Sequence, residues 1–107
     1  MFIAMNRFKI APGWEDEFEK MWLSRDTHLE DVPGFNKFHL LKGPQSDGFR
    51  LYSSHSIWDS KEAFETWTQS NAFRQAHQGA KPKEGMYLGS PKFEGFEVLQ
   101  TITETTS

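Results

Sequence analysis

The chain has 107 residues, which is enough for one domain and too short for two. Its 12 basic and 15 acidic side chains leave a net charge of −3, and no basic run provides the footprint of a nucleic-acid-binding protein. The sequence contains no cysteine, which excludes disulfides, thiolate catalysis, zinc fingers and iron–sulfur clusters. Because it also has no apolar signal-peptide core and no membrane-spanning stretch, we expect a cytoplasmic protein with no membrane partner.

The first strand and the first helix are predicted from the spacing of apolar side chains. Residues Phe2 to Ile10 alternate between two faces, which predicts a half-buried strand. Pro12-Gly13 ends this strand, and apolar residues at helical spacing predict a helix from Trp14 to Arg25. A turn containing Pro33-Gly34 follows this helix.

The middle of the chain predicts a pair of strands followed by a helix. The segments Phe35–Lys42 and Phe49–Trp58 have the composition of strands, and a turn-rich loop at 43–48 joins them. Asp59, with Glu62 three residues later, resembles a capping box and predicts the start of a helix.

The second helix carries an apolar stripe and then a candidate break. The stripe consists of Ala63, Phe64 and Trp67. Ser70 is a second plausible N-cap, so residues 71–77 are predicted as a separate short helix at an angle to the first. If the chain bends there, Trp67 and His77 approach one pocket from different directions.

The last part of the chain predicts a loop, a strand and a tail. Residues 78–91 are rich in Gly, Lys and Pro, which predicts an open loop suited to closing over a ligand. Phe93–Ile102 is predicted as the last strand, and residues 103–107 as a frayed tail. We therefore expect one domain over residues 1–102.

The order β-α-β-β-α-β predicts the α+β class, with the antiparallel sheet of a ferredoxin-like fold. In such a fold one face of the sheet carries the helices and the other is left uncovered. Several strands here have aromatic side chains on both faces. We therefore expect the uncovered face to meet a second copy of the chain, which gives a homodimeric α+β barrel.

Three residues are candidates for chemistry, and each has an ordinary structural alternative. Asn6 lies on an otherwise apolar strand face, where its amide needs a partner from a ligand or from neighbouring backbone. His77 ends a helix, where it would either ligate a metal or meet the negative end of the helix dipole. Trp67 belongs either to the core or to a pocket for a flat ligand. The sequence has 10 Phe, 4 Trp and 2 Tyr residues, and such a content of aromatic side chains is compatible with either role.

Other sites are less well supported by the sequence. His28, His39 and His55 are rivals to His77 without supporting context, and no pair of histidines has the i, i+4 spacing of a zinc-binding helix. The sequence has no G-x-S-x-G, P-loop or G-x-G-x-x-G motif.

The three candidates together resemble one family. The run from Trp67 to His77 is similar to the W-x-x-S-x-x-F-x-x-A-H segment of the IsdG-type haem-degrading monooxygenases, in the antibiotic-biosynthesis monooxygenase superfamily of dimeric ferredoxin-like barrels. Asn6-Arg7-Phe8 resembles the Asn-bearing first strand of that family, and Pro33-Gly34-Phe35 resembles its turn into the second strand. The likeness extends over residues 1–102.

The resemblance implies that Asn6, Trp67 and His77 form the catalytic set. His77 would be the proximal ligand of the haem iron, Asn6 would donate a hydrogen bond on the opposite side, and Trp67 would distort the porphyrin. Arg25 matches a position near the haem propionates in relatives, although a surface arginine paired with Asp26 or Glu30 remains an alternative.

The implied activity is haem degradation with haem as both substrate and oxygen-activating cofactor, together with O2 and an external electron donor. Iron and a bilin-type product would be released. Without a flavin or nicotinamide motif, the electrons would come from a separate reductase or a small reductant. Two alternatives stay open: a cofactor-free monooxygenase acting on an aromatic or quinol substrate, and a non-catalytic haem carrier or sensor.

Overall fold

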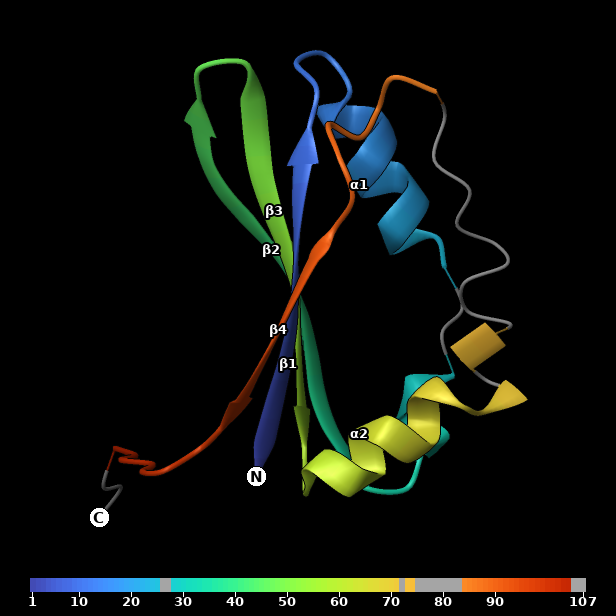
Figure 1. Ribbon diagram of the computed structural model, residues 1–107, viewed down its shortest axis with the longest axis vertical. Helices are drawn as coiled ribbons and strands as arrows, with labels where there is room; N and C mark the ends of the chain where they lie inside the picture. Colours follow the sequence, from blue (N-terminus) through green and yellow to red (C-terminus); the bar gives the residue numbers. More distant parts are fainter. Residues whose placement is uncertain (26–27, 72, 75–83, 105–107) are drawn as a thin grey trace.

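The computed structural model of the protein describes residues 1–25, 28–71, 73–74 and 84–104. Its elements in chain order are β1 (Phe2–Ile10), α1 (Glu15–Leu23), the short 3-10 helix η1 (Leu29–Asp31), β2 (Phe35–Ser46), β3 (Phe49–Trp58), α2 (Lys61–Thr68) and β4 (Lys92–Glu97). The four strands form one antiparallel sheet in the order β2-β3-β1-β4. Both helices lie on one side of this sheet, α1 towards one end and α2 towards the other (Figure 1). The predicted ferredoxin-like fold is confirmed.

The second strand is longer than predicted, and the loop at 43–48 is correspondingly shorter. β2 continues to Ser46, and only Asp47-Gly48 remains to make the turn into β3. The strand register shifts between Lys42 and Gln45, and this irregularity accommodates Pro44, which has no N–H to donate. The turn residues were therefore recognised correctly, but four of them belong to a bulged strand.

The capping residue of the second helix also differs from the prediction. The hydroxyl of Ser60 accepts a hydrogen bond from the backbone N–H of Ala63 at 3.1 Å, so Ser60 and not Asp59 is the N-cap. Asp59 instead accepts a hydrogen bond from the side chain of Asn36 at 2.8 Å, which joins the start of α2 to β2. Gly34, in the turn before β2, has a φ of +82°. A Cβ at this position would lie 2.5 Å from the Cβ of Ala63 on α2, so the turn requires glycine.

The last strand is shorter than the predicted Phe93–Ile102. β4 ends at Glu97, the register partner of Phe2 at the beginning of β1. Beyond that point the N–H of Val98 donates to the carbonyl of Met1 at 2.9 Å. Leu99 and Ile102 are 95% and 83% exposed. The apolar side chains that suggested a longer strand are therefore outside the core.

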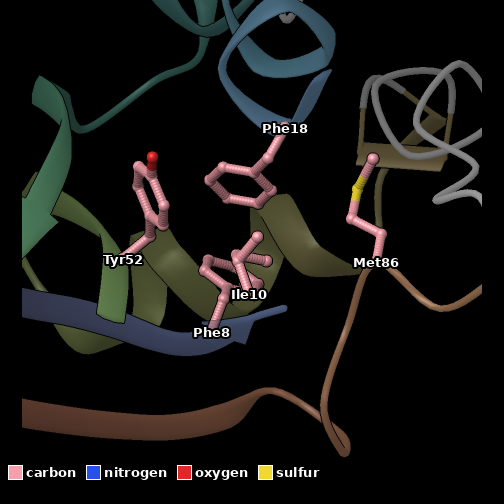
Figure 2. Packing of buried hydrophobic residues seen from close by; sticks show 5 residues of the cluster. All are labelled: Phe8, Ile10, Phe18, Tyr52 and Met86. Carbon is pink, nitrogen blue, oxygen red and sulfur yellow. The ribbon is translucent and has the colours of Figure 1, made fainter. Parts of the chain in front are cut away.

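The core beneath α1 is a cluster of large side chains from separate parts of the chain. It consists of Phe8, Ile10, Phe18, Tyr52 and Met86 (Figure 2). Met86 belongs to the segment predicted as an open loop, yet it is 1% exposed. Its carbonyl accepts a hydrogen bond from the N–H of Ala11 at 2.9 Å, and Leu88 donates to the carbonyl of Lys9 at 2.8 Å. The described end of this loop is thus fastened to the end of β1.

A second cluster lies beneath α2, at the other end of the sheet. Its buried members are Phe2, Ala4, Leu29 and Trp58, with Phe64 and Trp67 of α2 packed against them. None of the α2 side chains is fully buried. The apolar face of α2 is therefore only partly covered by the sheet.

No helix among the described residues is long and apolar enough to cross a membrane.

Glu19 connects α1 to the sheet and gives a prediction about pH. Its carboxylate accepts a hydrogen bond from the hydroxyl of Tyr52 and pairs with Lys42 at 2.8 Å, and these contacts lower its pKa below the ordinary 4.5. A lowered pKa in the folded state contributes stability above pH 4.5, and this contribution is lost as the pH falls through the lowered value. We expect Glu19→Gln to destabilise the fold at pH 7 by about 1 kcal/mol, a difference that shrinks towards pH 3.

Urea denaturation between pH 7 and pH 3 measures this difference. Glu62→Gln, which changes an exposed carboxylate of α2, is the matched control and should leave the free energy of unfolding within about 0.5 kcal/mol of wild type. A Glu19→Gln effect that does not change with pH would show that the carboxylate charge is not the source of the stability.

Candidate functional site

A cavity of about 330 Å³ lies between the helix-covered face of the sheet and the two helices. Residues packed in both core clusters contribute to its lining. Its described lining consists of Ala4, Asn6, Trp22, Arg25, Leu29, Phe38, Ser54, Ser56, Phe64, Trp67, Thr68, Phe73 and Phe93. Six of these 13 side chains are aromatic, and five polar or charged side chains stand among them. This is the character of a small-molecule site.

The strand register explains why Asn6 faces the cavity. Side chains alternate along β1, so Asn6 shares the helix-covered face with Ala4 and Phe8. Its register partners are Ser54 on β3 and Phe93 on β4, and both line the same cavity. Among the residues that the structure describes, no group hydrogen-bonds to the Asn6 amide. The amide is therefore available to a ligand in the cavity.

Trp67 forms part of the opposite wall, on α2. Its ring lies 5.3 Å from that of Trp58 beneath it and meets the edge of Phe73 at 4.8 Å. Ser70 makes this second contact possible, because its hydroxyl donates to the carbonyl of Trp67 at 2.6 Å and accepts from the N–H of Phe73 at 3.2 Å. The predicted capping role of Ser70 is confirmed. It brings Phe73, one turn beyond α2, to the same cavity as Trp67.

The end of α1 closes the cavity with an aromatic pair and a cation. Trp22 stacks on Phe38 of β2, with 6.1 Å between ring centroids and 8° between planes. The Arg25 guanidinium lies 4.4 Å from the centre of the Trp22 ring. Burial lowers the pKa of Arg25, because the apolar surroundings disfavour its charge. Among the described lining residues Arg25 is the one charged side chain, so a bound anion would meet it there.

The histidines divide into two groups. His77 lies outside the described residues. His28, His39 and His55 are described, and none of them lines the cavity. His39 and His55 face each other across β2 and β3 on the opposite side of the sheet, with their Nδ1 atoms 3.3 Å apart. The three rivals to His77 are therefore not placed to reach a ligand in this cavity.

Several lining residues were not predicted as site residues from the sequence. Trp22 and Phe38 were assigned only to a helix and a strand, and Ser54 and Phe93 were not singled out. The signal for Ser54 was nevertheless present. Residues of β3 alternate as those of β1 do, so Ser54 and Ser56 are polar positions between Tyr52 and Trp58 on one face.

The chain is similar to known proteins in both sequence and fold. Residues 1–79 match the family model described as antibiotic biosynthesis monooxygenase. A staphylobilin-producing heme oxygenase of Staphylococcus haemolyticus is 27% identical over 78 residues, which cover 73% of this chain and 74% of the relative.

Solved structures give the same result. The heme-degrader MhuD from Mycobacterium tuberculosis, with two hemes bound in its active site, has 26% identity and a TM-score of 0.73, covering 96% of this chain and 100% of that one. A mutant of MhuD with two manganese protoporphyrin IX per active site has 27% identity and a TM-score of 0.77, with 97% and 100% covered. The resemblance stated from the sequence is thereby confirmed, and the chain belongs to the antibiotic biosynthesis monooxygenase family.

Proposed function

We propose that this protein is a haem-degrading monooxygenase of the IsdG type. It would bind haem through His77 and use O2 and external electrons to open the porphyrin ring, releasing iron and a bilin-type product. The observation that carries the proposal is the cavity itself: aromatic walls on opposite sides, one amide on the strand side and one cation at the α1 end. Similarity to a heme oxygenase and to MhuD supports the same choice of substrate.

The lining fits haem chemically. Haem is flat and apolar with carboxylates at one edge, so it matches aromatic walls and a single cation. Trp67 and Phe73 offer apolar surface on the helix side. Arg25, whose charge is disfavoured by burial, would be stabilised by a propionate carboxylate. The available amide of Asn6 suits a polar ligand atom near the centre of the ring.

Each residue would then have a separate role. The Asn6 amide donates a hydrogen bond on the strand side of the ring, and His77 holds the iron from the other side, as the resemblance implies. Trp67 presses on the ring because Trp58 supports it from behind at 5.3 Å. Haem is both the substrate and the group that supplies the iron for oxygen activation. A separate reductase or a small reductant supplies the electrons.

We further propose that the protein is a homodimer. The sheet face opposite the helices carries the apolar side chains Ile3, Met5, Leu41, Leu51, Ile57 and Phe96. Phe96 is 46% exposed and Leu41 is 39% exposed, although both belong to strands of the sheet. A second copy would cover this face, as the family resemblance implies. Light scattering after size exclusion measures the mass directly, and a monomer at micromolar concentration would contradict the proposal.

A haemin titration of the purified protein tests the proposed function. We expect a saturable Soret band that weakens strongly in His77→Ala, because the proximal ligand is lost. His28→Asn is the matched control: it removes a histidine that does not line the cavity, and asparagine tolerates the φ of 53° at this position. Its haemin affinity should stay within about twofold of wild type, since no contact with the ligand is removed.

Ascorbate added in air then separates the candidate functions. Decay of the Soret band to a bilin-like spectrum, with release of iron, supports the enzyme. A band that survives the reductant indicates a haem carrier or sensor. If no band forms, or if the band is indifferent to His77, haem is not the substrate and a cofactor-free monooxygenase of an aromatic or quinol substrate becomes the better proposal.

A further inference from the structure

We propose that Ser54 is a second positioning residue of the site, which hydrogen-bonds beside Asn6 to the polar group bound on the strand side of the haem. This inference rests on the proposed function and deepens it. It adds to Asn6 a hydroxyl group from a different strand.

The position of Ser54 follows from the sheet register. Ser54 on β3 lies directly opposite Asn6 on β1 in the antiparallel pair, so the two side chains project from the same face. Directly opposite residues have Cβ atoms about 4.5–5.5 Å apart, which allows both side chains to reach one small group above them. Ser54 is 8% exposed, and it lines the cavity.

The other hydroxyl groups of the described lining already have partners. The Ser56 hydroxyl accepts a hydrogen bond from the Trp58 indole at 2.9 Å and donates to the carbonyl of Ala4 at 3.4 Å. The Thr68 hydroxyl donates to the carbonyl of Glu65 at 2.7 Å. Ser54 differs from both, because within the described part of the chain no group hydrogen-bonds to its hydroxyl.

The Ser54 hydroxyl borders the open space of the cavity, so a ligand or a water molecule there can hydrogen-bond to it. A serine hydroxyl rotates freely and can donate or accept, whereas the Asn6 amide has fixed donors and a fixed acceptor. The pair can therefore hold a small polar group at two points, and the apolar surroundings strengthen both hydrogen bonds. Ser54 would fix the direction of this group, while Asn6 supplies the stronger donor.

Cyanide is a suitable probe, because it binds on the open side of ferric haem and accepts hydrogen bonds there. The dissociation constant of cyanide is measured by Soret titration of the haemin-loaded protein at one pH. We expect Ser54→Ala to weaken cyanide binding about 3- to 10-fold, the size of one lost hydrogen bond. Ser54→Thr keeps the hydroxyl and should restore most of the affinity.

Ser53→Ala is the matched control. Ser53 is the adjacent residue of β3 and is equally buried, but its side chain projects from the opposite face and donates to the carbonyl of Ser54. We expect its cyanide affinity to stay within about twofold of wild type, which separates a direct contact from a general effect on β3.

The outcomes distinguish this inference from the proposed function. If haemin binds to all variants and Ser54→Ala matches wild type in cyanide affinity, the role of Ser54 is wrong and the proposed function stands. If Ser53→Ala weakens cyanide as much as Ser54→Ala does, the effect is structural and the inference is also wrong. If wild type takes up no haemin, both proposals fall together.

Discussion

Replacing Asn6 with alanine is expected to lower the rate of haem degradation by about 10²–10³-fold, the usual cost of removing one oriented donor from a site that excludes water. Haemin affinity should change far less, because the aromatic walls and Arg25 remain. The rate is expected to fall because the Asn6 amide is held by the sheet and faces the cavity. No described group hydrogen-bonds to this amide. The amide can therefore meet the reacting group without reorganisation.

Single-turnover decay of the Soret band with ascorbate measures this rate, and a haemin titration of the same sample measures affinity. Asn36→Ala is the matched control, since Asn36 is exposed on β2 and binds Asp59 outside the cavity. Its decay rate should stay within about threefold of wild type, since the change does not reach the site. Equal decay in wild type and Asn6→Ala would show that the amide has no part in turnover.

Replacing Phe18 with alanine is expected to destabilise the fold by about 3–5 kcal/mol. Phe18 is 0% exposed and is the one buried side chain of α1. Its ring lies 4.5 Å from that of Tyr52 and 5.8 Å from that of Phe8, between centroids (Figure 2). Its loss would leave a cavity between helix and sheet, which these rigid rings cannot collapse to fill.

Urea denaturation at one fixed protein concentration measures the loss, because a dimer makes the apparent stability depend on concentration. Leu23→Ala is the matched control on the same helix: Leu23 is 77% exposed, so its truncation should cost less than about 0.5 kcal/mol. A Phe18→Ala protein as stable as Leu23→Ala would mean that α1 is not held to the sheet by this cluster.

The sequence by itself determined the fold class and much of the candidate site. Alternation along β1 was enough to place Asn6 on an apolar face, because the side-chain period of a strand depends only on local backbone geometry. Ser70 was recognised as a cap for the same reason, since an N-cap acts on backbone groups within three residues. Trp67, one turn before Ser70, followed from helical spacing and from the family resemblance. The role of His77 remains a prediction.

Only the tertiary structure decided which distant residues meet. Met86 is far from Ile10 in the sequence, and a Gly- and Pro-rich loop gives no local sign that its side chain fills the core. Trp22 and Phe38 stack across a helix and a strand, and the Arg25 guanidinium lies over the Trp22 ring at one end of the cavity. Ser54 meets Asn6 through a register set by long-range strand pairing. Local periodicity gives the face on which a side chain lies, whereas its neighbours across the cavity depend on how the whole chain packs.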